Sequence, residues 1–224
     1  MMRLQVGHIH DVAPGVEDER ILLLMLPGAK NTPQQLVEFG FIRALRERNL
    51  PVDVLALDAH VDLYLERADI EQVLQHALEE AHQYGYRRIW LLGISLGGSG
   101  AMICATQHRA QIEGIFLLAP FLGTRGLIAE VEAAGGLHDW QAGEVASRDH
   151  ERRLLEQIRC ITQDESRVPP VYLGYGSEDR YRGASIMLSE CLESHYVTAI
   201  PGGHDWETWL SLWNRLLDKQ PFAA

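Results

Sequence analysis

A serine framed by glycines joins two segments of different hydrophobic period, and this feature restricts the fold more than any other. Residues 88–92 form the short apolar run of a buried strand, and residues 99–108 have the pattern of a helix. The link between them is Gly93-Ile94-Ser95-Leu96-Gly97. In so sharp a reversal, a Cβ two residues to either side of the serine would collide with the neighbouring strand or helix. The pattern therefore predicts that Ser95 is a nucleophile held above the edge of a sheet, at the positive end of a helix.

Short apolar runs alternate with segments of helical period along most of the chain. Strands are expected at residues 21–26, 51–57, 88–92, 114–119, 170–174 and 196–200. Helices are expected at residues 34–47, 69–83, 99–108, 183–191 and 206–217. This alternation is typical of an α/β fold with a mostly parallel central sheet flanked by helices. A single domain over residues 1–224 is the natural size for such a fold.

The segment 121–168 breaks this alternation. It begins with glycines, continues with a helical patch near residues 127–134, and ends with a charged helix at about 144–161. We expect a small helical cap inserted after the strand that follows the nucleophile helix, in a position to cover Ser95. Six arginines and nine acidic residues give the cap a net charge of about -3, so it offers no strong attraction to phosphorylated substrates. Trp140 and His138 either line the pocket or pack the cap onto the body.

A serine hydroxyl is a weak nucleophile and needs an adjacent base, which needs a third group to fix its tautomer. Of the ten histidines, only His204 lies in a glycine-framed loop between the last expected strand and the last expected helix. Asp179 follows another strand, and its carboxylate can fold back toward His204. The adjacent Glu178 is the alternative, because the sequence does not decide which side chain reaches the imidazole. The order Ser, Asp, His along the chain fits a catalytic triad at the ends of parallel strands.

Four segments together resemble the α/β-hydrolase superfamily, in particular its short serine esterases of the carboxylesterase type. They are Pro27-Gly28-Ala29, Gly93 to Gly98, Gly176 to Asp179 and Gly202 to Trp206. The resemblance covers nearly the whole chain. It implies a sheet of six to eight mostly parallel strands, no cofactor, and hydrolysis of an ester through an acyl-enzyme.

The loop after the first buried strand is expected to complete an oxyanion hole. In enzymes of this type it supplies one of two backbone N–H donors, which we assign to Ala29 and Leu96. Lys30 beside it is either a solvated charge or a substrate contact, and the solvated state is favoured. Many superfamily members carry His-Gly before this loop, whereas this chain has Pro27-Gly28, so the shape of the hole is expected to differ. The usual first hairpin is expected to be reduced to one strand.

Composition excludes several classes of partner. A formal net charge of -11 and an isoelectric point near 5.3 oppose binding to nucleic acid or to an anionic membrane. The three cysteines match neither a disulfide framework nor a zinc pattern, and the first residues lack the apolar run of a signal peptide. We therefore expect a cytoplasmic protein with a small, neutral ester substrate and no metal. His8 and His10 beside Asp11 are read as a solvated strand end rather than a metal site.

Three functions are compatible with the sequence. Carboxylic ester hydrolysis is the leading hypothesis, because the triad is complete and ordered and the cap lacks obvious anion-binding residues. The same acyl-enzyme would serve a thioesterase or an acyltransferase, which the triad does not separate. A non-catalytic binding protein with the α/β-hydrolase fold is the third alternative, because a fold alone does not establish chemistry. The oligomeric state is open.

Overall fold

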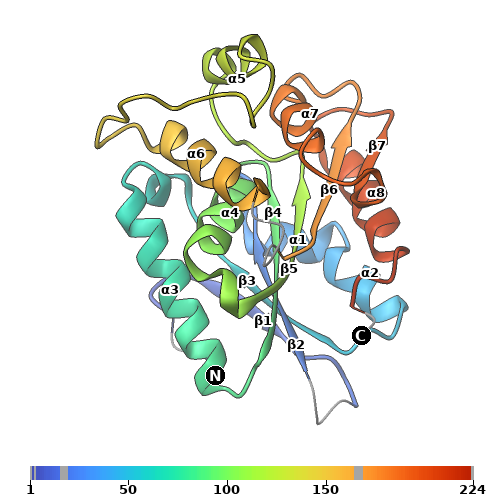
Figure 1. Ribbon diagram of the computed structural model, residues 1–224. Coiled ribbons are helices and arrows are strands. Elements are labelled where there is room, and N and C mark those ends of the chain that lie inside the picture. Colours follow the sequence, from blue (N-terminus) through green and yellow to red (C-terminus); the bar gives the residue numbers. More distant parts are fainter. Residues whose placement is uncertain (1, 3, 16–19, 164–168, 223–224) are drawn as a thin grey trace.

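A twisted sheet forms the centre of the molecule, with helices on both faces (Figure 1). The computed structural model describes residues 2, 4–15, 20–163 and 169–222. Within them the sheet has seven strands in the order β1-β3-β2-β4-β5-β6-β7, and only β1 is antiparallel to its neighbour. The strands are β1 (His8–Asp11), β2 (Ile21–Leu26), β3 (Val52–Leu57), β4 (Arg88–Ile94), β5 (Ile112–Leu118), β6 (Val171–Gly176) and β7 (Val197–Ile200). The predicted α/β architecture with a mostly parallel sheet is confirmed.

The helices follow the predicted order with two local differences. They are α1 (Pro33–Glu38), α2 (Phe41–Glu47), α3 (Arg67–Gln83), α4 (Leu96–His108), α5 (Arg125–Ala133), α6 (His150–Gln163), α7 (Gly183–Ser189) and α8 (Trp206–Leu217). Short 3-10 turns occur at η1 (Val61–Tyr64), η2 (Arg109–Gln111) and η3 (Ser194–Tyr196). The helix predicted at 34–47 is divided, because Gly40 adopts the left-handed conformation at φ 87°. The helix predicted from residue 144 begins only at His150, after an irregular segment that contains Gly143 at φ 64°.

The central strands of the sheet contribute side chains to two separate hydrophobic cores, one on each face. All six residues of β2 are buried. Leu22, Leu24 and Leu26 face the core beneath α3, α4 and α6, whereas the alternate residues face the core beneath α1, α2 and α8. A strand covered on both faces needs a continuous apolar run rather than an alternating one, which is the pattern seen at residues 21–26. Among the described residues, no helix combines the length and the apolar character needed to cross a membrane.

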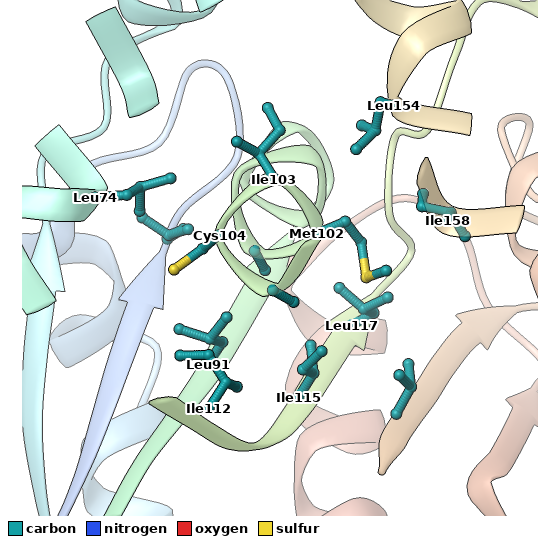
Figure 2. Packing of buried hydrophobic residues seen from close by; sticks show 14 of the residues in the cluster. Leu74, Leu91, Met102, Ile103, Cys104, Ile112, Ile115, Leu117, Leu154 and Ile158 are labelled. Carbon is teal, nitrogen blue, oxygen red and sulfur yellow. The ribbon is translucent and has the colours of Figure 1, made fainter. Parts of the chain in front are cut away.

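Helix α4 is the centre of one of these cores (Figure 2). Met102 and Cys104 of α4 lie over strands β4 and β5, while Leu154 and Ile158 of α6 approach α4 from the outer side. Helix α6 was expected to be part of the cap at 121–168, yet its apolar face is buried against the body of the protein. Helix α5 of the same segment packs beside α7 instead. Residues 164–168 of the expected cap lie outside the described residues.

The turn between β4 and α4 has almost no free space. Ser95 has φ 51° and ψ -116°, a conformation that few residues other than glycine adopt. A Cβ on Gly97 would lie 2.1 Å from the Leu26 carbonyl oxygen, and one on Gly93 would lie 2.4 Å from the Gly97 carbonyl oxygen. Both contacts are with backbone atoms, which cannot rotate away. The glycines therefore allow the start of α4 to press directly on β2.

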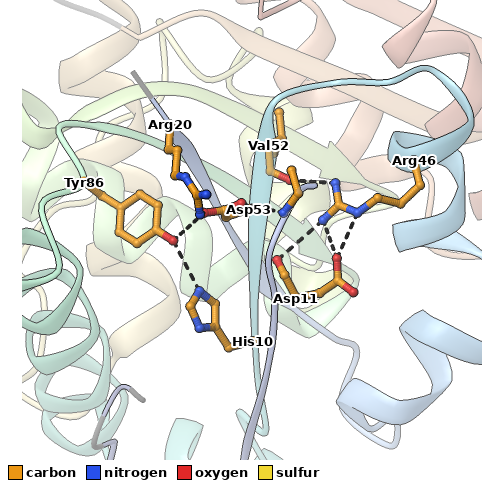
Figure 3. A network of polar contacts seen from close by, with 8 residues as sticks. His10, Asp11, Arg20, Arg46, Val52, Asp53 and Tyr86 are labelled. Carbon is orange, nitrogen blue, oxygen red and sulfur yellow. Dashed lines mark hydrogen bonds and ion pairs between the residues drawn. The ribbon is translucent and has the colours of Figure 1, made fainter. Parts of the chain in front are cut away.

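A buried carboxylate joins the N-terminal strands (Figure 3). Asp53 of β3 is fully buried and accepts hydrogen bonds from the Ala13 N–H at 2.7 Å, the Tyr86 hydroxyl at 2.6 Å and Arg20 at 3.0 Å. His10 reaches the same Tyr86 hydroxyl at 3.3 Å, and burial lowers the pKa of this imidazole. The expectation that His10 lies at a solvated strand end is thus wrong, because it is half-buried in this network. No group of three or more metal-ligating side chains occurs in the described part of the chain.

Replacement of Gly97 by alanine should destabilise the protein by roughly 3 kcal/mol or more, because the added methyl group meets backbone on every side. Gly126 in α5 is the matched control, since a Cβ there meets nothing within 4 Å. Gly126→Ala should change stability by less than about 1 kcal/mol, in the stabilising direction. Urea unfolding of both variants measures the difference, and equal midpoints would contradict this account of the turn.

Asp53→Ala should lower the free energy of unfolding by about 3 kcal/mol, because it removes the acceptor shared by the buried Ala13 N–H and Tyr86 hydroxyl and leaves fewer partners for Arg20. Asp62→Ala serves as the control. The Asp62 side chain is 75% exposed and pairs with the exposed His60, so its loss should cost less than about 0.5 kcal/mol. Thermal and urea unfolding distinguish the two results. A small loss for Asp53→Ala would mean that the network contributes little to stability.

Candidate active site

Three loops at one edge of the sheet carry the side chains that the sequence singled out. Ser95 follows β4, Asp179 follows β6 and His204 follows β7. These strands are parallel, so their carboxyl ends open onto the same edge. Residues separated by more than a hundred positions in the sequence therefore meet in space.

A continuous chain of hydrogen bonds links the three side chains. His204 Nδ1 lies 2.6 Å from Asp179 Oδ2, and His204 Nε2 lies 2.9 Å from Ser95 Oγ. An ionised carboxylate only accepts hydrogen bonds, so Nδ1 carries the hydrogen and Nε2 is left to accept from the serine hydroxyl. The Asp179 side chain is 1% exposed, whereas His204 is 18% exposed. The arrangement can remove the proton from the Ser95 hydroxyl as the oxygen attacks an electrophile.

The structure separates the two acidic candidates. The other carboxylate oxygen of Asp179, Oδ1, accepts a hydrogen bond from the Tyr181 N–H at 2.7 Å, which fixes the orientation of the group. Glu178 is exposed, and its backbone N–H donates to the Gly202 carbonyl at 3.0 Å. That bond ties the loop after β6 to the loop after β7. Glu178 thus contacts the histidine loop through its backbone, and Asp179 contacts the imidazole.

The loop of His204 is held by glycines and by the start of α8. Gly202 has φ 140°, a conformation that L side chains rarely adopt. The Gly203 N–H donates to Thr208 Oγ1 at 3.1 Å. Asp205 caps α8 by accepting from the Thr208 N–H at 2.9 Å. The imidazole is therefore carried on a short link to a capped helix, which limits its freedom.

Two aromatic rings that the sequence analysis did not identify flank the imidazole. Tyr181 and Trp209 each lie edge-on to His204 with ring centroids 5.0 Å away. Both line a pocket of about 440 Å³ together with Ser95 and His204. Trp209 lies in the first turn of the helix that follows His204, and this position is the one local signal that could have identified it.

The predicted oxyanion residues lie in the same pocket. Ala29 and Leu96 line it beside Ser95. A Cβ on Gly28 would lie 2.6 Å from Asn31 Oδ1 and 3.4 Å from Ser95 Cβ, so glycine lets this loop approach the serine. The Asn31 N–H donates to the Gly28 carbonyl at 2.9 Å, which closes the loop into a turn. Lys30 is exposed at the rim of the pocket.

The expected cap contributes less to this pocket than its position in the sequence indicates. Phe121 is its one residue among the pocket-lining residues in the described part of the chain. Trp140 is buried elsewhere, where its Nε1 donates to Glu130 at 2.9 Å. His138 is exposed and lies 3.2 Å from the Thr162 hydroxyl. Neither side chain lines the pocket of Ser95: Trp140 packs within the segment, whereas His138 lies at the surface.

Similar solved structures share this architecture. The S-formylglutathione hydrolase FrmB from Staphylococcus aureus is 15% identical, with a TM-score of 0.66 over 89% of this chain and 80% of that chain. Est1E from Butyrivibrio proteoclasticus is 17% identical, with a TM-score of 0.62 over 97% and 94% of the two chains. A monoacylglycerol lipase from Paleococcus ferrophilus is 15% identical, with a TM-score of 0.62 over 97% and 98%. At these identities the likeness establishes a common fold.

A family model supplies the functional assignment. The Esterase model, described as "Putative esterase", matches residues 64–219, which is more than half of the chain. The matched range includes Ser95, Asp179 and His204. No curated protein matches the sequence. The chain therefore belongs to the Esterase family, and it is a serine hydrolase of carboxylic esters built on the α/β-hydrolase fold.

Proposed function

We propose that Ser95, His204 and Asp179 are the catalytic triad and that esters are cleaved through an acyl-enzyme on Ser95. One observation carries this assignment, the unbroken sequence of contacts from Asp179 Oδ2 to His204 Nδ1 at 2.6 Å and from His204 Nε2 to Ser95 Oγ at 2.9 Å. Each group has the role for which its chemistry suits it. The carboxylate orients the base, the base accepts the proton, and the hydroxyl oxygen attacks.

Acylation begins when Ser95 Oγ attacks the ester carbonyl carbon and its proton passes to His204 Nε2. The carbonyl oxygen becomes an oxyanion, and the N–H groups of Ala29 and Leu96 are the proposed donors to it. The bond from carbon to the alcohol oxygen then breaks. His204 returns the proton to that oxygen, so the alcohol leaves in neutral form and the acyl group stays on Ser95.

Deacylation repeats these steps with water. His204 Nε2 takes a proton from a water molecule as its oxygen attacks the acyl carbon, and a second oxyanion forms at the same donors. Collapse of that intermediate returns the proton to Ser95 Oγ and releases the acid. Asp179, which is almost fully buried, stabilises the imidazolium present in both halves of the reaction.

The direction of proton transfer fixes how a substrate lies. Because His204 protonates the leaving oxygen, the alcohol part must lie on the side of His204, next to Tyr181 and Trp209. The acyl part is proposed to point away from His204, toward the part of the pocket wall that includes Leu96 and Phe121. A pocket of about 440 Å³ suits small esters, and the chain's net charge of -11 disfavours polyanionic ones. We therefore propose small, neutral esters as substrates.

The proposal also covers the partners and the compartment of the protein. Nucleic acid is not a partner, because the acidic chain would repel it. The cytoplasm is the proposed compartment, which the three free thiols of Cys104, Cys160 and Cys191 support. Thioester cleavage would use the same acyl-enzyme, and rates on matched oxygen and sulfur esters separate the two activities.

A fluorophosphonate probe should label the wild-type protein on Ser95. Ser95→Ala should lose labelling and lower kcat for p-nitrophenyl acetate by roughly 10⁴-fold or more. Ser99→Ala is the matched control, because Ser99 lies within α4 and donates to the Phe121 carbonyl. It should keep the label. A folded wild-type protein that resists both the probe and the ester would overturn the proposal.

Asp179→Asn should lower kcat by about 10³- to 10⁴-fold, because the amide favours the wrong imidazole tautomer. Glu178→Gln is its neighbour control and should change kcat less than about twofold, because that side chain is exposed. Steady-state kinetics with p-nitrophenyl acetate measures both. Similar losses in the two variants would contradict the assignment of Asp179.

A further inference from the structure

A second cavity borders the catalytic pocket at Leu96 and Phe121. Its volume is about 220 Å³, and it shares only those two residues with the pocket of Ser95. Its other walls come mostly from η1, the starts of α3 and α6, and the first half of α4. Most of the side chains that line it are apolar. Three of the polar ones carry a buried atom that has no hydrogen-bond partner among the described residues.

Three polar atoms on residues that line this cavity are buried without a hydrogen-bond partner in the described part of the chain. They are the Tyr64 hydroxyl, Arg67 Nη1 and His150 Nδ1. Arg67 is 6% exposed, and its other nitrogens are occupied, with Nε paired to Glu71 and Nη2 bonded to Gln157 at 2.5 Å. A buried donor left unpaired opposes folding, so a water molecule or a ligand oxygen is expected to reach the Tyr64 hydroxyl and Arg67 Nη1.

The position of Tyr64 depends on a glycine in the middle of a helix. A Cβ on Gly100 of α4 would lie 2.6 Å from the Tyr64 hydroxyl oxygen. Glycine weakens a helix at such a position, and here it leaves room for the hydroxyl. Burial raises the pKa of Tyr64 well above its usual value, so the group stays a neutral hydrogen-bond donor.

The proposed mechanism determines which part of a substrate can enter this cavity. The leaving alcohol lies beside His204, Tyr181 and Trp209, and none of these three lines the second cavity. The acyl group leads away from His204, toward Leu96 and Phe121, which form the boundary between the two spaces. The cavity is therefore placed to receive the far end of an acyl chain.

The charges around the cavity favour a neutral oxygen over a carboxylate. The positive charge of Arg67 is already paired with Glu71. Glu151 also lines the cavity, where its carboxylate accepts from the Thr124 N–H at 2.8 Å. A second carboxylate would be repelled by the charge of Glu151. A ketone or hydroxyl oxygen can accept from Tyr64 and Arg67 without this repulsion.

We infer that this cavity is an acyl subsite for short acyl chains that carry a neutral oxygen at their far end, held by the Tyr64 hydroxyl and Arg67 Nη1. The inference rests on the proposed acyl-enzyme mechanism and names its substrate class, esters of short oxo- or hydroxy-acids. Tyr64 and Arg67 act here as specificity-determining residues and take no part in the bond-breaking steps.

The test compares isosteric esters that differ only in the far oxygen. The first pair is p-nitrophenyl 4-oxopentanoate and p-nitrophenyl 4-methylpentanoate. The second pair is p-nitrophenyl 5-oxohexanoate and p-nitrophenyl 5-methylhexanoate. The enzymatic rate for each ester is divided by the rate of its hydroxide-catalysed hydrolysis. Wild type should prefer the oxo ester in kcat/KM by about tenfold or more for at least one pair. Tyr64→Phe and Arg67→Met should abolish that preference. Both variants should keep kcat/KM for p-nitrophenyl acetate within about threefold, because the acetyl group ends before the cavity.

Stability provides an independent readout. Tyr64→Phe removes a hydroxyl that has no partner in the described structure, so the unliganded variant should be at least as stable as wild type in thermal unfolding. Tyr64→Phe alone is sufficient for the test if Arg67→Met fails to fold.

Three outcomes decide between the alternatives. Equal kcat/KM values for the oxo and methyl esters in both wild type and Tyr64→Phe, with acetate still hydrolysed, would overturn the subsite. A preference for the succinate half-ester over both oxo esters would overturn its neutral character. Absence of acetate hydrolysis by wild type would instead refute the proposed mechanism.

Discussion

The close contact between the start of α4 and strand β2 determines the geometry of this active site. A Cβ on Gly97 would lie 2.1 Å from the Leu26 carbonyl oxygen, so only glycine permits this approach. The contact forces Ser95 into a strained conformation with φ 51° and ψ -116°. Leu26 is also the last residue of the strand that leads into the loop of Gly28 and Ala29. One contact therefore sets both the nucleophile and one proposed oxyanion donor.

The surrounding structure holds the strained turn and the base in register. The Ser95 N–H donates to the Leu118 carbonyl of β5 at 3.0 Å, and the Phe121 N–H donates to the Ser95 carbonyl at 2.8 Å. On the opposite side, Gly176 lets the loop after β6 approach the Gly202 carbonyl, where a Cβ would come within 2.3 Å. Three parallel strands of one sheet, β4, β6 and β7, thus supply the three loops, and backbone contacts between loops supply the precision that side chains alone would not.

The sequence predicted the parts of the site that have local signals. Ser95 and His204 are framed by glycines that are needed for backbone reasons, so their loops could be identified without knowledge of distant contacts. The choice between Asp179 and Glu178 could not be made, because it depends on how the loop after β6 meets the loop after β7. Tyr181 and Trp209 were missed for a similar reason, since an aromatic residue has no sequence mark that distinguishes a pocket wall from a core. The docking of α6 on α4 also depends on tertiary packing, whereas the break between α1 and α2 lies at Gly40, a residue that is visible in the sequence.

In the proposed mechanism, Ser95 attacks while the N–H groups of Ala29 and Leu96 face the developing negative charge. A crystal structure of the protein after reaction with diethyl p-nitrophenyl phosphate tests this directly, because the adduct resembles the tetrahedral intermediate. The account predicts a bond from phosphorus to Ser95 Oγ, with the phosphoryl oxygen about 2.7–3.1 Å from both backbone nitrogens. An adduct on another residue, or a phosphoryl oxygen turned away from both nitrogens, would contradict it.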